Sequence, residues 1–310
     1  MVIAMRTMEL GRTGLCVPVI GVGCMRLPEL SKDEARRFIF SAIEQGANFF
    51  DHADIYGRGE AERLFGEVAD TTPSLREKMI LQSKCGIVPG ERFDFSKEHI
   101  LSSVDGSLQR LRTEYLDVLL LHRPDALMEP EEVAEAFRIL KASGKVRHFG
   151  VSNQNPGQMR LLQKYMDMPI AADQLQLSIA HANMISRGIC VNMENQWAAD
   201  RDGDVLNFCR LEDITIQPWS PFQHGFFKGT FIGNPEFAEL NRCLDEIGGE
   251  YGVSATTIAM AWLLRHPAGF QPITGTMKTG RLTECLKAAE ITITRQQWYD
   301  IYKSAGNILP

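Results

Sequence analysis

Short apolar runs rich in β-branched residues alternate along the chain with longer segments in which apolar residues recur every three or four positions. The short runs are typical of buried strands, and the longer segments are typical of amphipathic helices. The strand predictions fall at residues 19–23, 49–53, 79–85, 116–122, 147–152, 172–177, 215–220 and 271–276. Strands that alternate with helices in this way indicate parallel βαβ units.

The first predicted helix shows both of its ends in the sequence. Ser31 and Glu34 form an S-x-x-E capping box, and from Ala35 onwards apolar residues recur at helical spacing. Gly46 then follows as a residue that ends a helix. Apolar repeats predict further helices around residues 100–111, 133–140, 159–166 and 254–265.

The number of predicted strands, with helices between them, is the number that a (β/α)8 TIM barrel contains. We therefore predict an α/β fold of this type in a single domain over residues 1–310, with a short N-terminal β-hairpin formed by residues 7–10 and 15–18. An open doubly wound sheet is the alternative, but no G-x-G-x-x-G motif follows an early strand. Residues 179–207 have poor periodicity, and we expect a long loop or an irregular helix there on the catalytic face.

Composition and charge narrow the classes of function. The hydrophobic share of 44%, the charged share of 23% and the net charge of −6 are ordinary for a soluble globular protein. No cluster of cations suits nucleic acid, no apolar stretch approaches the ~20 residues of a membrane span, and the start lacks a signal peptide core. The seven cysteines are scattered without a C-x-x-C pair, so we expect reduced thiols, no metal site and a cytoplasmic protein.

The candidate chemistry lies where the predicted strands end. Asp51 and Tyr56 fall at and after the end of the second strand, Lys84 ends the third, and His122 ends the fourth. Barrels of this class place their active sites at the C-terminal ends of the strands, and an ionisable group that ends a buried strand needs a partner or a function. We therefore expect these four side chains to share one site.

The four residue types suit general acid catalysis. Asp51 would hold the Lys84 ammonium in its charged form, and that ammonium would lower the pKa of Tyr56 from about 10. Such a phenol could protonate an oxygen at working pH while His122 donates a hydrogen bond to the same oxygen. A lysine at a strand end also permits a Schiff-base aldolase, which stays open as an alternative.

The same residues lie in motifs that resemble the aldo-keto reductases. Asp-x-x-x-x-Tyr-Gly at 51–57, Gln-Ser-Lys-Cys at 82–85 and Leu-Leu-His-Arg-Pro-Asp at 120–125 resemble the signatures of the second, third and fourth strands. Gly-Lys-Val-Arg-His-Phe-Gly-Val-Ser-Asn at 144–153 resembles that of the fifth. The resemblance covers nearly the whole chain and is greatest to the predicted-oxidoreductase branch with Asp-His-Ala-Asp-Ile-Tyr-Gly. It implies NADPH-dependent reduction of a small-molecule aldehyde or ketone to an alcohol, with Tyr56 as the acid.

The resemblance also implies a binding site for NADPH. Ser152, Asn153 and Gln174 would hold the nicotinamide carboxamide, and Trp219 would stack on the ring in place of the family's usual tyrosine. The other residues that it assigns to the cofactor are Gly23, Met25, Asp51, Ser220, Pro221, Phe222, Gly225, Gly275, Thr276, Lys278, Arg281, Glu284 and Cys285.

Within that set, residues 220–225 would lie along the pyrophosphate. Lys278 and Arg281 would bind the adenosine 2′-phosphate beside a helix start, where cations and backbone N–H groups act together. Cys285 stands where the family usually has asparagine, so the adenine contact departs from the family pattern.

The substrate wall is predicted from position alone. His52, Trp197, Phe222 and His224 fall in loops of the expected catalytic face. A non-catalytic NADPH-binding sensor or regulatory subunit is the second alternative, which the complete set of four catalytic residue types disfavours.

Overall fold

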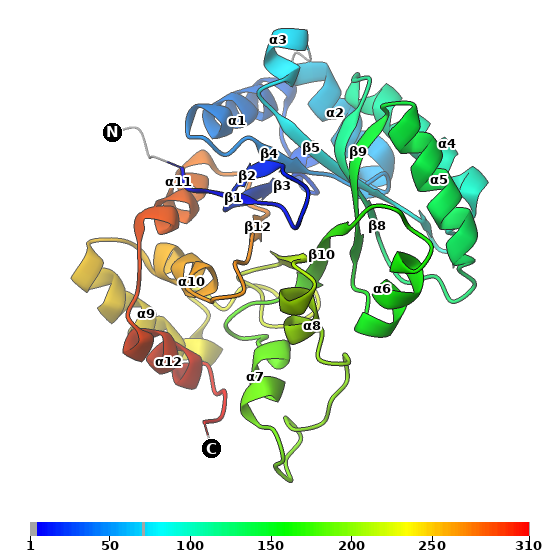
Figure 1. Ribbon diagram of the computed structural model, residues 1–310. Coiled ribbons are helices and arrows are strands. Elements are labelled where there is room, and N and C mark those ends of the chain that lie inside the picture. Colours follow the sequence, from blue (N-terminus) through cyan, green and yellow to red (C-terminus); the bar gives the residue numbers. More distant parts are fainter. Residues whose placement is uncertain (1–4, 70–71, 310) are drawn as a thin grey trace.

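The computed structural model describes residues 5–69 and 72–309. Within these ranges the strands of the main sheet are β3 (Gly21–Gly23), β4 (Phe49–Asp51), β5 (Ile80–Cys85), β8 (Leu116–Leu121), β9 (Val146–Ser152), β10 (Ile170–Gln176), β11 (Thr215–Trp219) and β12 (Ile273–Thr274). They are parallel and close into a barrel in the spatial order β10-β11-β12-β3-β4-β5-β8-β9 (Figure 1). The predicted (β/α)8 barrel is confirmed, and each predicted strand is present with bounds that differ by a few residues.

Helices surround this barrel and cover its outer face (Figure 1). In the part of the chain that the structure describes, the α-helices are α1 (Lys32–Glu44), α2 (Glu60–Val68), α3 (Pro73–Arg76), α4 (Lys97–Leu111), α5 (Pro130–Ala142), α6 (Pro156–Gln163), α7 (Asn183–Ile189), α8 (Val205–Leu211), α9 (Ala238–Tyr251), α10 (Ala255–Leu264), α11 (Thr279–Lys287) and α12 (Arg295–Ser304). Short 3-10 turns are η1 (Leu27–Glu29), η2 (Tyr56–Gly59), η3 (Pro235–Phe237) and η4 (Ala288–Glu290).

Helix α1 begins and ends as predicted. The Ser31 N–H donates to Glu34 Oε2 at 2.9 Å, and Ser31 Oγ accepts from the Glu34 N–H at 3.4 Å. These two bonds satisfy N–H groups that have no partner within the helix. After the helix, Gly46 takes a φ of +78°, which a residue without a Cβ adopts at no steric cost.

The segment with poor periodicity is partly helical. It contains α7 and the start of α8, and residues 190–204 between them form neither helix nor strand. Asn195 Oδ1 accepts two backbone N–H groups at 2.9 and 3.1 Å, and Asp200 Oδ1 accepts two more at 3.1 and 2.8 Å. Local side-chain-to-backbone bonds of this kind hold turns without any apolar period, which explains why the segment resists interpretation from the sequence.

The predicted N-terminal hairpin consists of β1 (Thr7–Glu9) and β2 (Cys16–Pro18), which pair antiparallel. Its turn lies at the end of the barrel where the strands begin, because the Gly11 N–H donates to Thr215 Oγ1 at 2.8 Å. A Cβ on Gly11 would lie 2.5 Å from the Ala171 carbonyl oxygen, so only glycine permits this approach. The hairpin thus covers one end of the barrel, and the candidate catalytic residues lie toward the other end.

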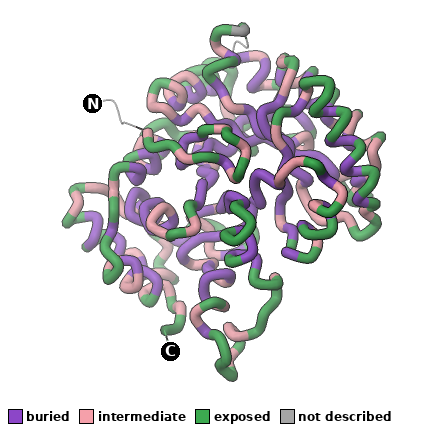
Figure 2. The backbone as a smooth tube through the Cα atoms, viewed as in Figure 1, coloured by how far each residue is buried: buried purple, intermediate pink, exposed green. Residues whose placement is uncertain are grey.

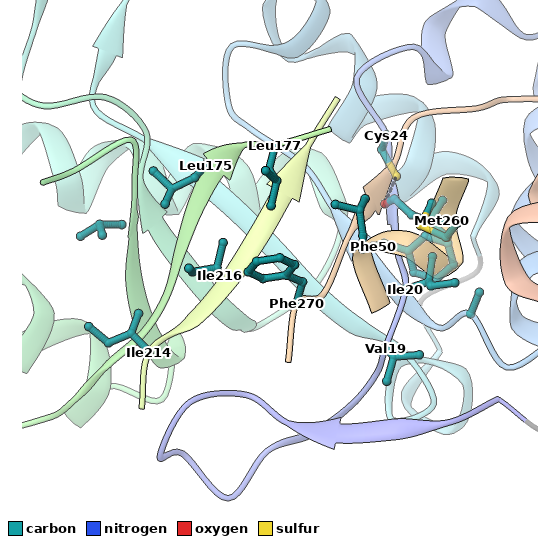
Figure 3. Packing of buried hydrophobic residues seen from close by; sticks show 14 of the residues in the cluster. Val19, Ile20, Cys24, Phe50, Leu175, Leu177, Ile214, Ile216, Met260 and Phe270 are labelled. Atoms are coloured by element: carbon teal, nitrogen blue, oxygen red, sulfur yellow. Dashed lines mark hydrogen bonds between the residues drawn. The ribbon is translucent and has the colours of Figure 1, made fainter. Parts of the chain in front are cut away.

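Packing against the helices fixes which strand residues point into the barrel. Figure 2 shows the barrel strands buried along most of their length, and Figure 3 shows Phe50 and Ile216 among the packed side chains outside the strands. Both are at most 1% exposed, and full burial of such a side chain contributes about 1.5–3 kcal/mol. Because side chains alternate along a strand, Phe50 facing outward places Phe49 and Asp51 inside the barrel.

Candidate active site

The four predicted catalytic residues meet at the C-terminal ends of neighbouring strands. Asp51 is the last residue of β4, and Lys84 is the last residue but one of β5. His122 directly follows β8, and Tyr56 is the first residue of η2. Lys84 Nζ lies 2.8 Å from Asp51 Oδ1 and 3.1 Å from the Tyr56 hydroxyl oxygen. The Tyr56 and His122 rings meet edge to face with centroids 5.8 Å apart. The parallel pairing of β4, β5 and β8 therefore brings all four side chains into one site.

Lys84 is completely buried and remains an ammonium. Burial by itself lowers the pKa of Lys84, but the Asp51 carboxylate and the Tyr56 hydroxyl outweigh burial and leave that pKa above its ordinary value. The ammonium donates to Asp51, to the His52 carbonyl oxygen at 2.7 Å and to the Tyr56 hydroxyl. Its three protons therefore all have acceptors within the site.

The expected fall in the pKa of Tyr56 does not occur. Burial raises the pKa of the phenol above 10, and the Lys84 ammonium lowers it by less than burial raises it. Tyr56 is therefore a neutral phenol at neutral pH. The ammonium beside its oxygen still stabilises any negative charge that develops there, so the direction of the Lys84 effect is the predicted one while the net shift is the opposite.

His122 is a neutral imidazole in this site. Burial, followed by the charges of Lys84 and Arg123, holds its pKa well below 6.5. Its Nδ1 is buried and has no hydrogen-bond partner among the described residues. A neutral imidazole beside the Tyr56 ring can donate one hydrogen bond without carrying a charge.

The residues predicted to hold a nicotinamide carboxamide lie next to these four. Ser152 Oγ donates to the Gln174 carbonyl oxygen at 2.9 Å, and Asn153 Nδ2 donates to Ser152 Oγ at 2.7 Å. Trp219 Nε1 donates to Asn153 Oδ1 at 3.2 Å, and Gln174 Nε2 donates to Asp51 Oδ1 at 3.1 Å. One hydrogen-bonded chain thus links the ends of β9, β10 and β11 to the Asp51 carboxylate.

Three buried glutamines inside the barrel escaped the sequence analysis. Gln82 Nε2 donates to Asp51 Oδ1 at 2.7 Å and to Gln217 Oε1 at 2.9 Å. Gln217 Nε2 donates to Gln271 Oε1 at 2.9 Å, and Gln271 Nε2 donates to the Pro18 carbonyl oxygen at 2.8 Å. A connected row of amides therefore runs from the Asp51 carboxylate to the hairpin. The available signal was the placement of glutamine inside otherwise apolar strands.

The loop after β11 carries an aromatic surface. Ser220 adopts a φ of +53°, a conformation that is uncommon outside glycine, and turns the chain away from the strand. Phe226 and Phe227 are 60% and 59% exposed, and their rings lie 6.1 and 6.4 Å from that of Trp219. Exposed neighbouring phenylalanines are typical of a binding surface, and the sequence analysis did not single them out.

The residues predicted to bind the adenosine phosphate lie around the start of α11. Lys278 precedes this helix without capping it through its side chain, and both Lys278 and Arg281 are exposed. The first N–H groups of the helix and two cations therefore face the same region, which suits a phosphate. Across from them, Met25 is 43% exposed and Arg26 Nε donates to the Gly275 carbonyl oxygen at 3.0 Å.

Some predicted residues lie elsewhere. His52 is fully buried, and its ring packs edge to face against the Phe65 ring with centroids 4.7 Å apart. It therefore does not line the mouth of the barrel. Trp197 lines a separate hollow in the segment between α7 and α8, and none of the four catalytic candidates lines that hollow. Cys285 is fully buried with its Sγ 3.6 Å from Thr274 Oγ1, so it offers no side chain to an adenine at the surface. His224 is half-buried with its ring 5.0 Å from that of Phe237.

Two further kinds of site were searched for in residues 5–69 and 72–309. These residues contain no group of three or more His, Cys, Asp or Glu side chains arranged to hold a metal ion. They also contain no helix with the length and apolar character needed to cross a membrane.

Fold and site together define an oxidoreductase on a (β/α)8 barrel. The chain matches the family model described as Aldo/keto reductase family over residues 19–305, and it belongs to that family. It is 39% identical to the uncharacterized oxidoreductase YcsN of Bacillus subtilis (strain 168), over 90% of this chain and 91% of the relative. It is 36% identical to a 6-dehydroglucose reductase of Agrobacterium fabrum, over 86% of each chain.

A solved structure agrees with this assignment. The thermostable aldo-keto reductase Tm1743, crystallised with the inhibitor epalrestat, superposes with a TM-score of 0.78 at 26% identity and covers 97% of this chain and 100% of its own. The resemblance found in the sequence motifs is therefore confirmed at the level of the family.

Proposed function

We propose that this protein reduces an aldehyde or ketone to an alcohol with NADPH and that Tyr56 is the general acid. The observation that carries the proposal is the contact between the Tyr56 hydroxyl and the Lys84 ammonium, 3.1 Å apart, beside the neutral His122. A carbonyl oxygen placed between Tyr56 and His122 would accept two hydrogen bonds, and the phenol would transfer its proton as negative charge develops on that oxygen.

The residues present suit NADPH. Buried polar atoms without partners among the described residues include His122 Nδ1, Gln176 Nε2 and Gln223 Oε1, at or beyond the ends of β8, β10 and β11. Ser152, Asn153 and Trp219 would hold and stack the nicotinamide, and Lys278 and Arg281 would bind the 2′-phosphate. The chemistry that bound NADPH supplies is donation of a hydride to the carbonyl carbon.

The role of each protein residue follows from its contacts. Lys84 stabilises the charge left on the Tyr56 oxygen when the phenol gives up its proton. Asp51 holds the ammonium in place. The side-chain amides of Gln82 and Gln174 donate hydrogen bonds to Asp51 and hold it in turn. His122 orients the carbonyl. We further propose that residues 1–310 form one domain, which a single cooperative unfolding transition would support.

The aldolase alternative conflicts with the state of Lys84. A Schiff base requires a neutral amine with a free lone pair, whereas this side chain is a fully bonded ammonium whose pKa is raised. The reductase names of relatives such as the 6-dehydroglucose reductases agree with carbonyl reduction. We accordingly include sugar-derived aldehydes in the substrate panel.

The decisive test of the acid is Tyr56→Phe. We expect turnover of aldehydes, followed by NADPH oxidation, to fall by about a hundredfold or more, with little change in NADPH affinity measured by fluorescence titration. Tyr299→Phe on α12, outside the site, is the matched control and should behave as the wild type. Turnover in Tyr56→Phe close to that of the control would remove Tyr56 from the mechanism. If the wild-type protein binds NADPH tightly but reduces none of the carbonyl compounds in the panel, this result would instead favour a non-catalytic NADPH sensor.

The cofactor assignment is tested separately with Arg281→Ala. Loss of one charge-assisted phosphate contact should weaken NADPH binding by about tenfold and leave NADH binding unchanged. Arg295→Ala, at the exposed start of α12, is the control. An unchanged ratio of the two affinities would contradict the phosphate contact.

A further inference from the structure

Arg123 is a cation at the mouth of the barrel that neither the proposed acid chemistry nor the proposed cofactor site uses. It directly follows His122 at the end of β8, and its side chain is half-buried. Its guanidinium carbon lies 5.8 Å from the centroid of the Trp219 ring and 5.8 Å from that of Phe226. The guanidinium therefore extends from β8 to the aromatic surface of the loop after β11.

No anionic side chain in the part of the chain that the structure describes neutralises this cation. Of the described residues, none is within ion-pair distance of Arg123, and none accepts a hydrogen bond from it. The nearest acidic residue in the sequence, Asp125, is engaged otherwise, because its carboxylate accepts the Phe95 and Leu127 N–H groups, each at 2.9 Å. Burial lowers the pKa of Arg123, and interaction with Tyr56 acts in the opposite direction, so the guanidinium would stabilise negative charge on the Tyr56 oxygen.

The remainder of the site leaves this charge uncompensated. Lys84 is paired with Asp51, and Tyr56 and His122 are neutral. The site therefore has an excess of one positive charge in a protein whose net charge is −6. A guanidinium removed from part of its water gains most from a planar anion that accepts two parallel hydrogen bonds.

Position distinguishes a substrate anion from the adenosine phosphate. In the closed barrel, β8 is four strands away from β12 in either direction, so it lies diametrically opposite the strand that leads to Lys278 and α11. Arg123 is instead adjacent in sequence to His122, which would orient the carbonyl. A group bound by Arg123 would thus belong to the same substrate molecule as the reacting carbonyl and lie near that carbonyl.

We propose that Arg123 binds a carboxylate of the substrate, so that the preferred substrates are carbonyl compounds carrying an acid group on the side toward β8 and Phe226. This inference rests on the proposed reductase function and adds the substrate class. Arg123 binds the acid through paired hydrogen bonds, while the rings of Trp219 and Phe226 hold the guanidinium over the mouth.

The test compares acids with their methyl esters, which keep the carbonyl and lose the charge. The pairs are 4-carboxybenzaldehyde with methyl 4-formylbenzoate, and succinic semialdehyde with methyl 4-oxobutanoate. For the wild type we expect kcat/KM to favour each acid by about tenfold or more, since hydrogen bonds to charged groups are the strong ones. In Arg123→Met the acids should lose this advantage, so that the ratio of kcat/KM for each acid to kcat/KM for its ester falls to about one. Arg123→Lys should restore part of it, and Arg138→Met, on the exposed face of α5, is the control.

Binding without turnover separates this inference from the reductase proposal. We expect calorimetric titration of the protein with benzoate to show binding that Arg123→Met abolishes and Arg138→Met retains. Esters reduced as well as acids by the wild type, or equal losses on both in Arg123→Met, would overturn the role of Arg123. Weakened NADPH binding in Arg123→Met with an unchanged acid-to-ester ratio would overturn it too, by assigning Arg123 to the cofactor. Arg123-dependent benzoate binding without reduction of any of the four compounds would support the anion site and refute the reductase proposal for them.

Discussion

Two ion pairs are buried to the same degree in this protein and serve different ends. The Lys84 side chain, at the C-terminal end of β5, is 0% exposed, and that of Asp51, at the C-terminal end of β4, is 4% exposed. The side chains of Arg76 and Asp117, near the start of β8, are 5% and 3% exposed. The two pairs also share a separation of 2.8 Å. Burial and distance therefore do not distinguish a structural pair from a functional one.

The Arg76–Asp117 pair is satisfied entirely by the fold. Arg76 also donates to the Met79 and Tyr115 carbonyl oxygens, each at 2.9 Å. Asp117 also accepts the Leu81 N–H at 2.9 Å, and it accepts a bond from Arg147 at 3.1 Å. These partners are backbone groups, apart from the Arg147 side chain, which has no role in the proposed mechanism.

The Lys84–Asp51 pair also contacts Tyr56, the proposed general acid. One proton of Lys84 is donated to the Tyr56 hydroxyl, and the His122 ring lies beside Tyr56. Among the described residues, His122 Nδ1 has no hydrogen-bond partner, and the neighbouring Arg123 guanidinium, which lies over Trp219, has no anionic partner. What separates the two pairs is therefore the presence of polar atoms around one of them that the fold leaves without partners. Such atoms are where a ligand can gain most free energy on binding.

The largest expected difference is in activity. Lys84→Met should reduce turnover by about a hundredfold or more, because the Tyr56 oxygen loses the cation that stabilises it when the proton leaves. Turnover is measured per folded molecule, with the folded fraction read from circular dichroism, and exposed Lys145→Met is the control. Turnover near that of the control would show that the two pairs do not differ in function.

The next difference is in stability. Asp117→Leu leaves the buried Arg76 guanidinium without its carboxylate and removes the bond to the exposed Arg147, so it should lower the free energy of unfolding by about 3–5 kcal/mol. Urea denaturation measures the change, and turnover per folded molecule should stay about the same. Asp105→Leu removes the exposed pair with Lys145 and should cost about 0–1 kcal/mol. Similar losses in both variants would contradict the assigned role of Asp117.

A third buried carboxyl, Asp173, has no cationic partner among residues 5–69 and 72–309, and its stability contribution should respond to pH instead. Burial raises its pKa to about 8, more than the nearby N–H groups of Gln154 and Asn153 lower it. The native state then keeps a proton that the unfolded chain loses near pH 4, so stability decreases as pH rises between these values. Between pH 6 and pH 8 the loss should be about 2 kcal/mol.

Comparison with Asp173→Asn isolates this group. The asparagine variant should lose about 2 kcal/mol less than the wild type over the same pH range. Taking the difference between the two proteins matters because burial also raises the pKa of Asp54, to about 7, and acts in the same direction. Parallel pH profiles of urea midpoints would contradict a proton on Asp173.

The smallest expected effect lies at the far end of the glutamine row. Gln271→Leu removes the bond to the Pro18 carbonyl oxygen and the acceptor for Gln217, and it should lower stability by about 1 kcal/mol. Turnover should be about unchanged, because Gln82 and Gln174 still hold Asp51. A large loss of turnover with intact stability would show that the whole row positions the catalytic carboxylate.

The order of residues along the chain is enough to predict the helices and strands and the chemical types at the strand ends. Apolar runs of strand length and the capping box at Ser31 are local patterns, and local patterns specify local structure. Asp51, Lys84 and His122 could be assigned to one site because parallel strands end on the same face of a barrel. The family resemblance of the motifs gave the same result.

Which polar groups have hydrogen-bond or ion-pair partners depends on the closed barrel. The net rise in the pKa of Tyr56, the burial of His52 and Cys285, the glutamine row and the position of Arg123 over Trp219 all depend on neighbours that are distant in sequence. Desolvation and hydrogen bonding act over a few ångströms in space, and the chain brings those groups together only when the barrel closes. Patterns along the sequence therefore name the candidate residues, and packing determines their state.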